Sequence, residues 1–125
     1  MKKILLVDDD RISRTLLRHC LKKQGYEVEE VASATEALVT FRQSSPDLVV
    51  SDVLMPQING FEFCQKLRST PSGQLVPFIF LTSQNHLKYL VESHSIGADA
   101  YLSKPFEISE LLVKINALLE KSPCI

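Results

Sequence analysis

The fold is decided first by the stretch Ile4-Leu5-Leu6-Val7-Asp8-Asp9-Asp10. Four consecutive apolar residues are typical of a strand that is buried on both faces, as the strands of a parallel sheet are. The apolar run ends at three carboxylates, and apolar residues then recur at the spacing of one helical face. That face consists of Ile12, Leu16, Leu17, Cys20 and Leu21. The opening of the chain therefore predicts a strand followed directly by a helix.

The same order of strand and helix recurs along the rest of the chain. We expect a weaker edge strand at Glu27–Val31, followed by a helix that Ser33 and Glu36 begin as a capping box. Further strands are expected at residues 48–50, 78–81 and 100–102, each followed by a helical pattern, at about 61–67, 85–95 and 108–119. Five such repeats predict an α/β fold, with a parallel sheet covered by helices on both faces and joined by right-handed crossovers.

Composition narrows the class of protein. The chain has 125 residues, the size of one ordinary domain, and we see no linker, so we expect one domain over residues 1–125. A net charge of −1 gives no general attraction to nucleic acid or to an anionic membrane. No apolar run is long enough to span a membrane, and the three cysteines lack the spacing of a disulfide framework or zinc site. We therefore expect a cytoplasmic protein, with Cys20 and Cys64 as small core residues.

Polar side chains follow the predicted strands at the points where the strands end. Asp8 to Asp10 follow the first strand, Asp52 the third, Thr82 the fourth and Lys104 the fifth. Because the carboxyl ends of parallel strands meet at one edge of the sheet, these side chains should lie together there. Clustered carboxylates repel one another unless a cation joins them, and Mg²⁺ prefers a few carboxylates with waters and a phosphate. With a hydroxyl and an ammonium beside it, such a site suits transfer of a phosphoryl group to a carboxylate.

Each of these residues has an ordinary interpretation when it is considered alone. Asp8 to Asp10 are typical of the cap of a helix, where acidic side chains suit the helix dipole. Thr82 is typical of a turn, and Lys104 of a solvated surface. The functional interpretation depends on all of them meeting at the same edge of the sheet.

Four segments of the sequence together resemble the receiver domains of two-component signalling systems. They are residues 4–9, residues 47–56 with Gly60, residues 80–83 and residues 97–106, so the resemblance covers nearly the whole chain. The resemblance implies a flavodoxin-like (βα)5 three-layer sandwich whose five-stranded parallel sheet has the order 2-1-3-4-5. It also implies a phosphorylation-dependent signalling switch that catalyses only its own phosphoryl transfer and dephosphorylation.

The resemblance assigns the metal and the phosphoryl group to particular residues. Asp52 is expected to be the phosphoacceptor, with Mg²⁺ as the cofactor. Asp9 and Asp52 are expected to bind the metal directly, Asp8 mainly through water, and Leu54 through its backbone carbonyl. Lys104 is expected to contact the phosphoryl oxygens.

Three further residues are assigned to the switch and to the geometry of the site. Thr82 is expected to contact the phosphoryl group and to move together with the ring of Tyr101, while Pro105 is expected to follow a cis peptide bond. The expected partners are a histidine kinase or histidine phosphotransfer protein, and an output domain or target bound by the face of the fourth helix, fifth strand and fifth helix. Candidate contact residues on that face are Lys88, Tyr89, Glu92, Tyr101, Glu107 and Glu110.

Two other functions share part of this pattern. A Mg²⁺-dependent phosphohydrolase would also use an aspartyl nucleophile, but it usually needs a cap insertion over the site, and the loops here are short. A receiver-like module that binds a partner without phosphorylation would not require the complete acidic set. The sequence favours the phosphorylated receiver domain over both.

Overall fold

The structure, a computed structural model, describes residues 2–53, 55, 57–83, 98–104 and 106–120, with only the backbone of Thr82 and Ser83. Five strands form one parallel sheet: β1 (Lys3–Val7), β2 (Glu27–Val31), β3 (Leu48–Asp52), β4 (Phe78–Ser83) and β5 (Ala100–Lys104). Their order is β2-β1-β3-β4-β5, which confirms the expected order and the position of β2 at an edge.

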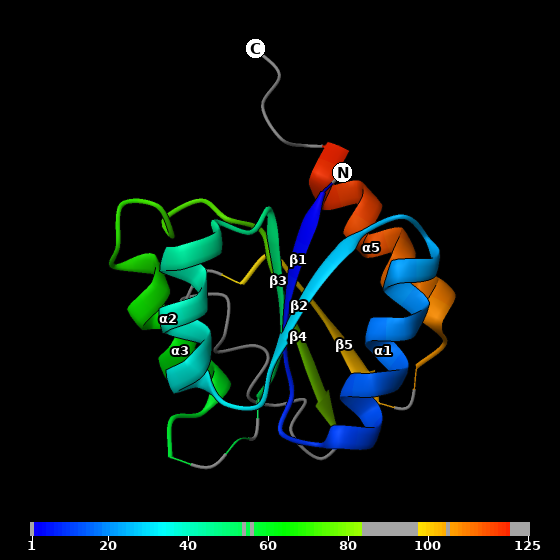
Figure 1. Cartoon of the computed structure of the whole chain (residues 1–125), viewed down its shortest axis with the longest axis horizontal. Coiled ribbons are helices and arrows are strands. Elements are labelled where there is room, and N and C mark those ends of the chain that lie inside the picture. The colour runs from blue at the N-terminus through cyan, green and yellow to red at the C-terminus, as the bar shows by residue number, and fades with distance from the viewer. Residues whose placement is uncertain (1, 54, 56, 84–97, 105, 121–125) are drawn as a thin grey trace.

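Helices cover both faces of the sheet. Helices α2 (Ala34–Ser44) and α3 (Gly60–Arg68) lie on one side, and α1 (Arg11–Lys23) and α5 (Ile108–Glu120) lie on the other (Figure 1). The three-layer arrangement is thus confirmed. The helix expected at 85–95 lies outside the described residues. Among the described helices, none has both the length and the apolar character to cross a membrane.

The place of β1 between two helical layers explains why residues 4–7 are all apolar. Ile4 and Leu6 belong to the core on the side of α1 and α5, while Leu5 and Val7 belong to the core on the side of α2 and α3. Successive side chains of a strand point to opposite faces, so a strand between two helical layers must be apolar at every position. All four side chains are fully buried.

Helix α1 differs from its prediction in how much of its apolar face is covered. Leu17 and Leu21 are buried, but Ile12 is 73% exposed, Leu16 is 62% exposed and Cys20 is only half-buried. The helical period was correct, but the apolar stripe is wider than the surface that the sheet and α5 cover. Ile12, Leu16 and Cys20 are therefore not the fully buried residues that the pattern indicated.

The strands that carry the site also extend further than expected. Strand β3 ends at Asp52 and not at Val50, and β5 ends at Lys104 and not at Leu102. The apolar run ends earlier than the pairing of the backbone, because Asp52 still pairs with Leu81 and Lys104 still pairs with Ser83. The backbones of Asp52 and Lys104 are therefore held by the sheet and do not lie in loops.

Candidate metal centre

Two neighbouring strands bring the predicted acidic residues together. Asp8 follows the last residue of β1 and Asp52 ends β3, and these strands pair in parallel with Val7 opposite Ser51. One carboxylate oxygen from each of Asp8, Asp9 and Asp52 lies within 4.8 Å of the others. The gathering of carboxylates that the sequence predicted is present at this edge of the sheet.

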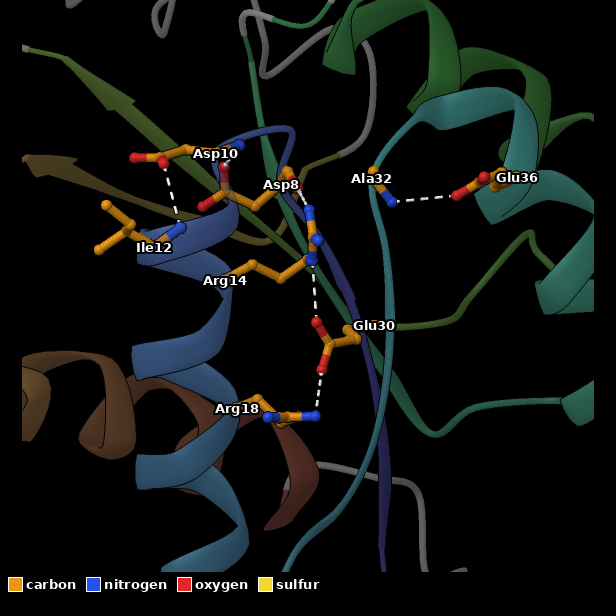
Figure 2. A network of polar contacts seen from close by, with 8 residues as sticks. All are labelled: Asp8, Asp10, Ile12, Arg14, Arg18, Glu30, Ala32 and Glu36. Atoms are coloured by element: carbon orange, nitrogen blue, oxygen red, sulfur yellow. Dashed lines mark hydrogen bonds and ion pairs between the residues drawn. The ribbon is translucent and has the colours of Figure 1, made fainter.

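Asp10 has a different place from Asp8 and Asp9. Its side chain accepts a hydrogen bond from the N–H of Ile12, so Asp10 is the N-cap of α1 (Figure 2). Its own N–H donates to Asp8 Oδ1 at 2.9 Å. The helix-capping interpretation of the acidic run is therefore correct for Asp10, whereas Asp8 and Asp9 belong to the cluster.

Lys104 reaches this cluster from two strands away. Its Nζ lies 3.0 Å from Asp52 Oδ1 and 3.8 Å from Asp8 Oδ2. Strand β4 separates β3 from β5, so the long side chain crosses over it to the acidic edge. The predicted meeting of an ammonium with the carboxylates is present in the structure.

Burial makes the negative charge of the cluster costly. Asp8 is 0% exposed and Asp52 is 8% exposed. Burial, together with the neighbouring negative charge of Asp8, raises the pKa of Asp52 from its ordinary value near 3.8 to about 7, although Lys104 opposes this rise. Burial disfavours the charge of Lys104, but Asp52 and the other nearby carboxylates outweigh burial and raise the pKa of Lys104. One lysine therefore does not balance the buried carboxylates.

The donor atoms of this cluster fit a hard divalent cation. Asp8 Oδ2 is buried, and it accepts no hydrogen bond within the described part of the chain. Lys104 Nζ, at 3.8 Å, is too far away to donate a hydrogen bond to it. A buried charged oxygen without a hydrogen bond is costly unless a cation joins it. Asp9 is exposed, which leaves one side of the cluster open to water. Mg²⁺ binds through one or two carboxylates and keeps several waters, so the residues present suit this ion.

Some of the predicted site residues are placed only in part. Leu54, Pro105 and the side chain of Thr82 lie outside the described residues, although the Thr82 backbone pairs with Ser103 in the sheet. Tyr101 is half-buried and packs against the core on the side of α2 and α3. Of the other candidate contact residues on the output face, Lys88, Tyr89 and Glu92 lie outside the described residues, and Glu107 and Glu110 are exposed at the start of α5.

Gly60 supports the site in a way that sequence reasoning did not derive. Its N–H donates to the carbonyl of Val53 at 2.7 Å, so the first residue of α3 lies directly against the end of β3. A Cβ atom at this position would lie 2.3 Å from the carbonyl oxygen of Asp52. The sequence indicated that Gly60 lies in a loop. In the structure it is the first residue of α3, and its backbone lies so close to that of Asp52 that no larger residue fits.

An apolar groove adjoins the acidic edge. It lies between α1 and the start of α5, has a volume of about 400 Å³, and includes Lys104 in its lining. Its apolar lining comes from Leu16, Leu17, Cys20, Phe106 and Ile108. The incomplete covering of α1 therefore leaves an apolar surface next to the acidic cluster.

Comparisons with known proteins agree with this architecture. Residues 4–116 match the family described as the response regulator receiver domain. The chain is 43% identical over 120 residues to the response regulator MprA of Mycobacterium sp. (strain KMS), covering 96% of this chain and 51% of that protein. The chain thus spans about half the length of the curated relatives it matches.

Solved structures give the same result. The chemotaxis response regulator CheY4 of Vibrio cholerae superposes with a TM-score of 0.88 at 35% identity, over 94% of this chain and 98% of that chain. The receiver domain of a sensor histidine kinase from Pseudomonas aeruginosa PAO1 superposes with a TM-score of 0.87 at 29% identity, over 95% and 98% of the two chains. That structure has a magnesium ion coordinated in its active-site cleft. With the family match over most of its length, this chain belongs to the receiver domains of response regulators in two-component signalling.

Proposed function

We propose that this chain is a phosphorylation-dependent switch whose phosphoacceptor is Asp52. The observation that carries the proposal is the carboxylate of Asp52, which lies beside Asp8 and Asp9 and 3.0 Å from the ammonium of Lys104. The donor is a histidine kinase or a histidine phosphotransfer protein. Residues 1–125 act as one receiver domain, in the cytoplasm, where kinases draw phosphoryl groups from ATP.

The transfer exchanges one bond to phosphorus for another. An oxygen of Asp52 forms a bond to phosphorus while the bond from phosphorus to the donor's imidazole nitrogen breaks. That nitrogen keeps the electron pair and takes up a proton, and Asp52 becomes an acyl phosphate. Asp52 must be ionised to act as the nucleophile, and a nearby cation favours the ionised form.

The other site residues hold the charge that moves during transfer. Asp9, Asp52 and the backbone carbonyl of Leu54 would hold Mg²⁺ directly and Asp8 mainly through water, and the bound ion would supply positive charge to the phosphoryl oxygens. Lys104 supplies a second positive charge, fixed at the end of β5 and already directed at Asp52. The hydroxyl of Thr82 donates a hydrogen bond to an oxygen of the transferred group. Because Lys104 and the three carboxylates are arranged before the donor arrives, little rearrangement of these side chains opposes the transfer.

The donor protein approaches across the groove between α1 and α5. Lys104 lines this groove and also contacts Asp52, so a protein seated on the groove lies next to the phosphoacceptor. Leu16, at 62% exposure, offers the apolar surface that such a contact buries. An apolar residue exposed beside a site is typical of a surface that a partner covers. Leu16→Arg should therefore slow transfer from a histidine phosphotransfer protein but leave transfer from acetyl phosphate unchanged.

The proposal is tested by the intact mass of the protein after incubation with acetyl phosphate and Mg²⁺. The wild type should gain one phosphoryl group, and Asp52→Ala should gain none. Asp10→Asn is the matched control, because it removes a neighbouring charge but keeps a residue that can cap α1, and it should be phosphorylated like the wild type. An adduct of equal yield on Asp52→Ala would remove Asp52 from its role. Steady turnover of phosphate monoesters would favour the phosphohydrolase instead.

A further inference from the structure

We propose that Arg14 is a positioning residue for the metal centre, because it fixes the peptide group that joins Asp8 to Asp9. This inference rests on the proposed function, since it assigns Asp8 and Asp9 to the metal. Arg14 lies in the first turns of α1, and its side chain is only 16% exposed. It is not one of the acidic residues, and its role depends on the bonds that it makes to the backbone.

The guanidinium of Arg14 joins three elements of the fold (Figure 2). Its Nη1 donates to the backbone carbonyl of Asp8 at 2.8 Å, where the chain leaves β1. Its Nε donates to Glu30 Oε1 on β2 at 2.9 Å. The other carboxylate oxygen of Glu30 is paired with Arg18 at 2.8 Å, so Glu30 is itself held in place. Arg14 therefore connects the Asp8 carbonyl to an anchored carboxylate.

The bond to the Asp8 carbonyl matters most for Asp9. A peptide group is planar, so fixing its oxygen also fixes the direction in which the chain continues to the next residue. Asp8 has further anchors, because its N–H donates to Val31 and its Oδ1 accepts from Asp10. Asp9 is exposed, and the described residues give its carboxylate no hydrogen bond or ion pair. The orientation of Asp9 therefore depends on the peptide that Arg14 holds.

Arginine suits this role better than lysine would. A guanidinium donates from several N–H groups in a rigid plane, so one group can bind Glu30 and the Asp8 carbonyl at the same time. A lysine ammonium is a point charge on a flexible stem and does not reproduce this arrangement. A substitution that keeps the charge should therefore still loosen the peptide.

Arg18 offers a matched control within the same network. It pairs with Glu30 and so ties α1 to β2, as Arg14 does, but in the described structure it makes no hydrogen bond or ion pair with Asp8. If Arg14 served only to attach α1 to β2, removing either arginine would have similar consequences. If Arg14 positions the acidic peptide, only its removal affects metal binding.

The test is the affinity for Mg²⁺, measured by titration calorimetry on the full chain without a phosphodonor. Arg14→Lys and Arg14→Ala should weaken Mg²⁺ binding by roughly tenfold or more, the usual effect of losing a residue that orients metal ligands. Arg18→Ala should stay within about twofold of the wild type on the same reasoning. Urea unfolding without metal shows that each variant is folded, and Arg14→Lys is the mildest change if Arg14→Ala does not fold.

A second readout examines the peptide directly. In metal-free protein, the NMR amide resonance of Asp9 should move in Arg14→Lys and stay in place in Arg18→Ala. Wild-type Mg²⁺ affinity in Arg14→Lys, or an equal loss in Arg18→Ala, would overturn the proposal. Acetyl phosphate labelling of the wild type is independent: if Mg²⁺ binds as described but Asp52 is not labelled, the proposed function fails and the role of Arg14 stands.

Discussion

At the scale of single residues, the site is built around an imbalance of charge. Asp8 and Asp52 are buried beside each other, and the single ammonium of Lys104 lies 3.0 Å from one and 3.8 Å from the other. Below about pH 7 the metal-free protein compensates in part by keeping a proton on Asp52, because the pKa of this buried carboxyl is raised to about 7. The same imbalance favours a divalent cation, so metal binding and proton loss should be coupled.

The raised pKa of Asp52 predicts how stability depends on pH without metal. The carboxyl titrates near 3.8 in the unfolded chain and at about 7 in the folded one, so the folded state binds more protons between these values. The free energy of unfolding should therefore fall as pH rises from about 4 to 7, by at most about 4 kcal/mol from this group. Urea unfolding across this range should show the fall in the wild type and lose it in Asp52→Asn. An equal slope in both proteins would contradict the assignment.

Substitution of Asp9 should affect Mg²⁺ affinity and the stability of the metal-free protein in different ways. Mg²⁺ uses few protein ligands, so Asp9→Ala should weaken its binding sharply. The same substitution removes one of the mutually repelling carboxylates, so the metal-free variant should be at least as stable as the wild type. Calorimetric titration and metal-free urea unfolding measure the two effects. Unchanged Mg²⁺ affinity would exclude Asp9 as a ligand.

At the scale of the elements, the sequence predicted the site because apolar runs locate the strands, although β3 and β5 extend beyond their apolar runs to Asp52 and Lys104. The placement of Asp8, Asp52 and Lys104 at one edge followed from the parallel order alone and is confirmed. Contacts between elements could not be predicted in this way. Arg14 and Glu30 are 16 residues apart and look like ordinary surface charges until β2 is placed beside α1.

The exposed part of α1 shows the same limit of sequence patterns. Ile12 and Leu16 keep the helical period of Leu17 and Leu21, but the period does not state how much of the stripe a neighbour will cover. Gly60 is a further case, because a glycine in a turn and a glycine under a crossing backbone look alike in the sequence. Only the structure, through strand pairing and side-chain packing, distinguishes a covered apolar residue from an exposed one and a turn glycine from a glycine beneath another backbone.

The contact between α3 and β3 gives a prediction at this scale. In Gly60→Ala the new methyl group would meet the Asp52 carbonyl, so α3 or the end of β3 must shift. We expect a loss of about 1–3 kcal/mol in unfolding free energy, as for other overpacked sites, together with weaker Mg²⁺ binding. Urea unfolding and calorimetric titration measure both.

Gly25→Ala is the control for this prediction. Gly25 has a φ of +97° and open space around it, so alanine there is strained by its backbone conformation alone. It should lose stability of a similar order, about 1–3 kcal/mol, without any change in Mg²⁺ affinity. If both variants lost metal affinity equally, the effect of Gly60 would be a general loss of stability.

At the scale of the whole molecule, the sheet separates two cores, and the acidic cluster lies at the carboxyl ends of its strands β1 and β3. Strand β5 carries Lys104 at its end and Tyr101 within it, so one strand links the site to a half-buried aromatic ring. We expect phosphorylation to shift an existing equilibrium between two conformations and not to build a new fold. Tyr101 is the ring whose position should report that shift.

This coupling is predicted to depend on Thr82. Thr82→Ala should still accept a phosphoryl group on Asp52, but it should lose much of the response of Tyr101, because no hydroxyl is drawn to the phosphoryl oxygens. NMR spectra of Tyr101 with and without beryllofluoride, in wild type and Thr82→Ala, compare the two responses. Equal shifts in both proteins would show that Thr82 is not the relay.

The phosphoryl group is expected to reside on Asp52, and chemical identification of the modified residue tests this without relying on a substitution. Borohydride reduces an acyl phosphate to an alcohol, so an aspartyl phosphate is converted to homoserine. After treatment with acetyl phosphate and Mg²⁺, reduction and peptide mass spectrometry, homoserine should be found at position 52. Homoserine at position 8 or 9, or none anywhere in a phosphorylated chain, would show that Asp52 is not the phosphoacceptor.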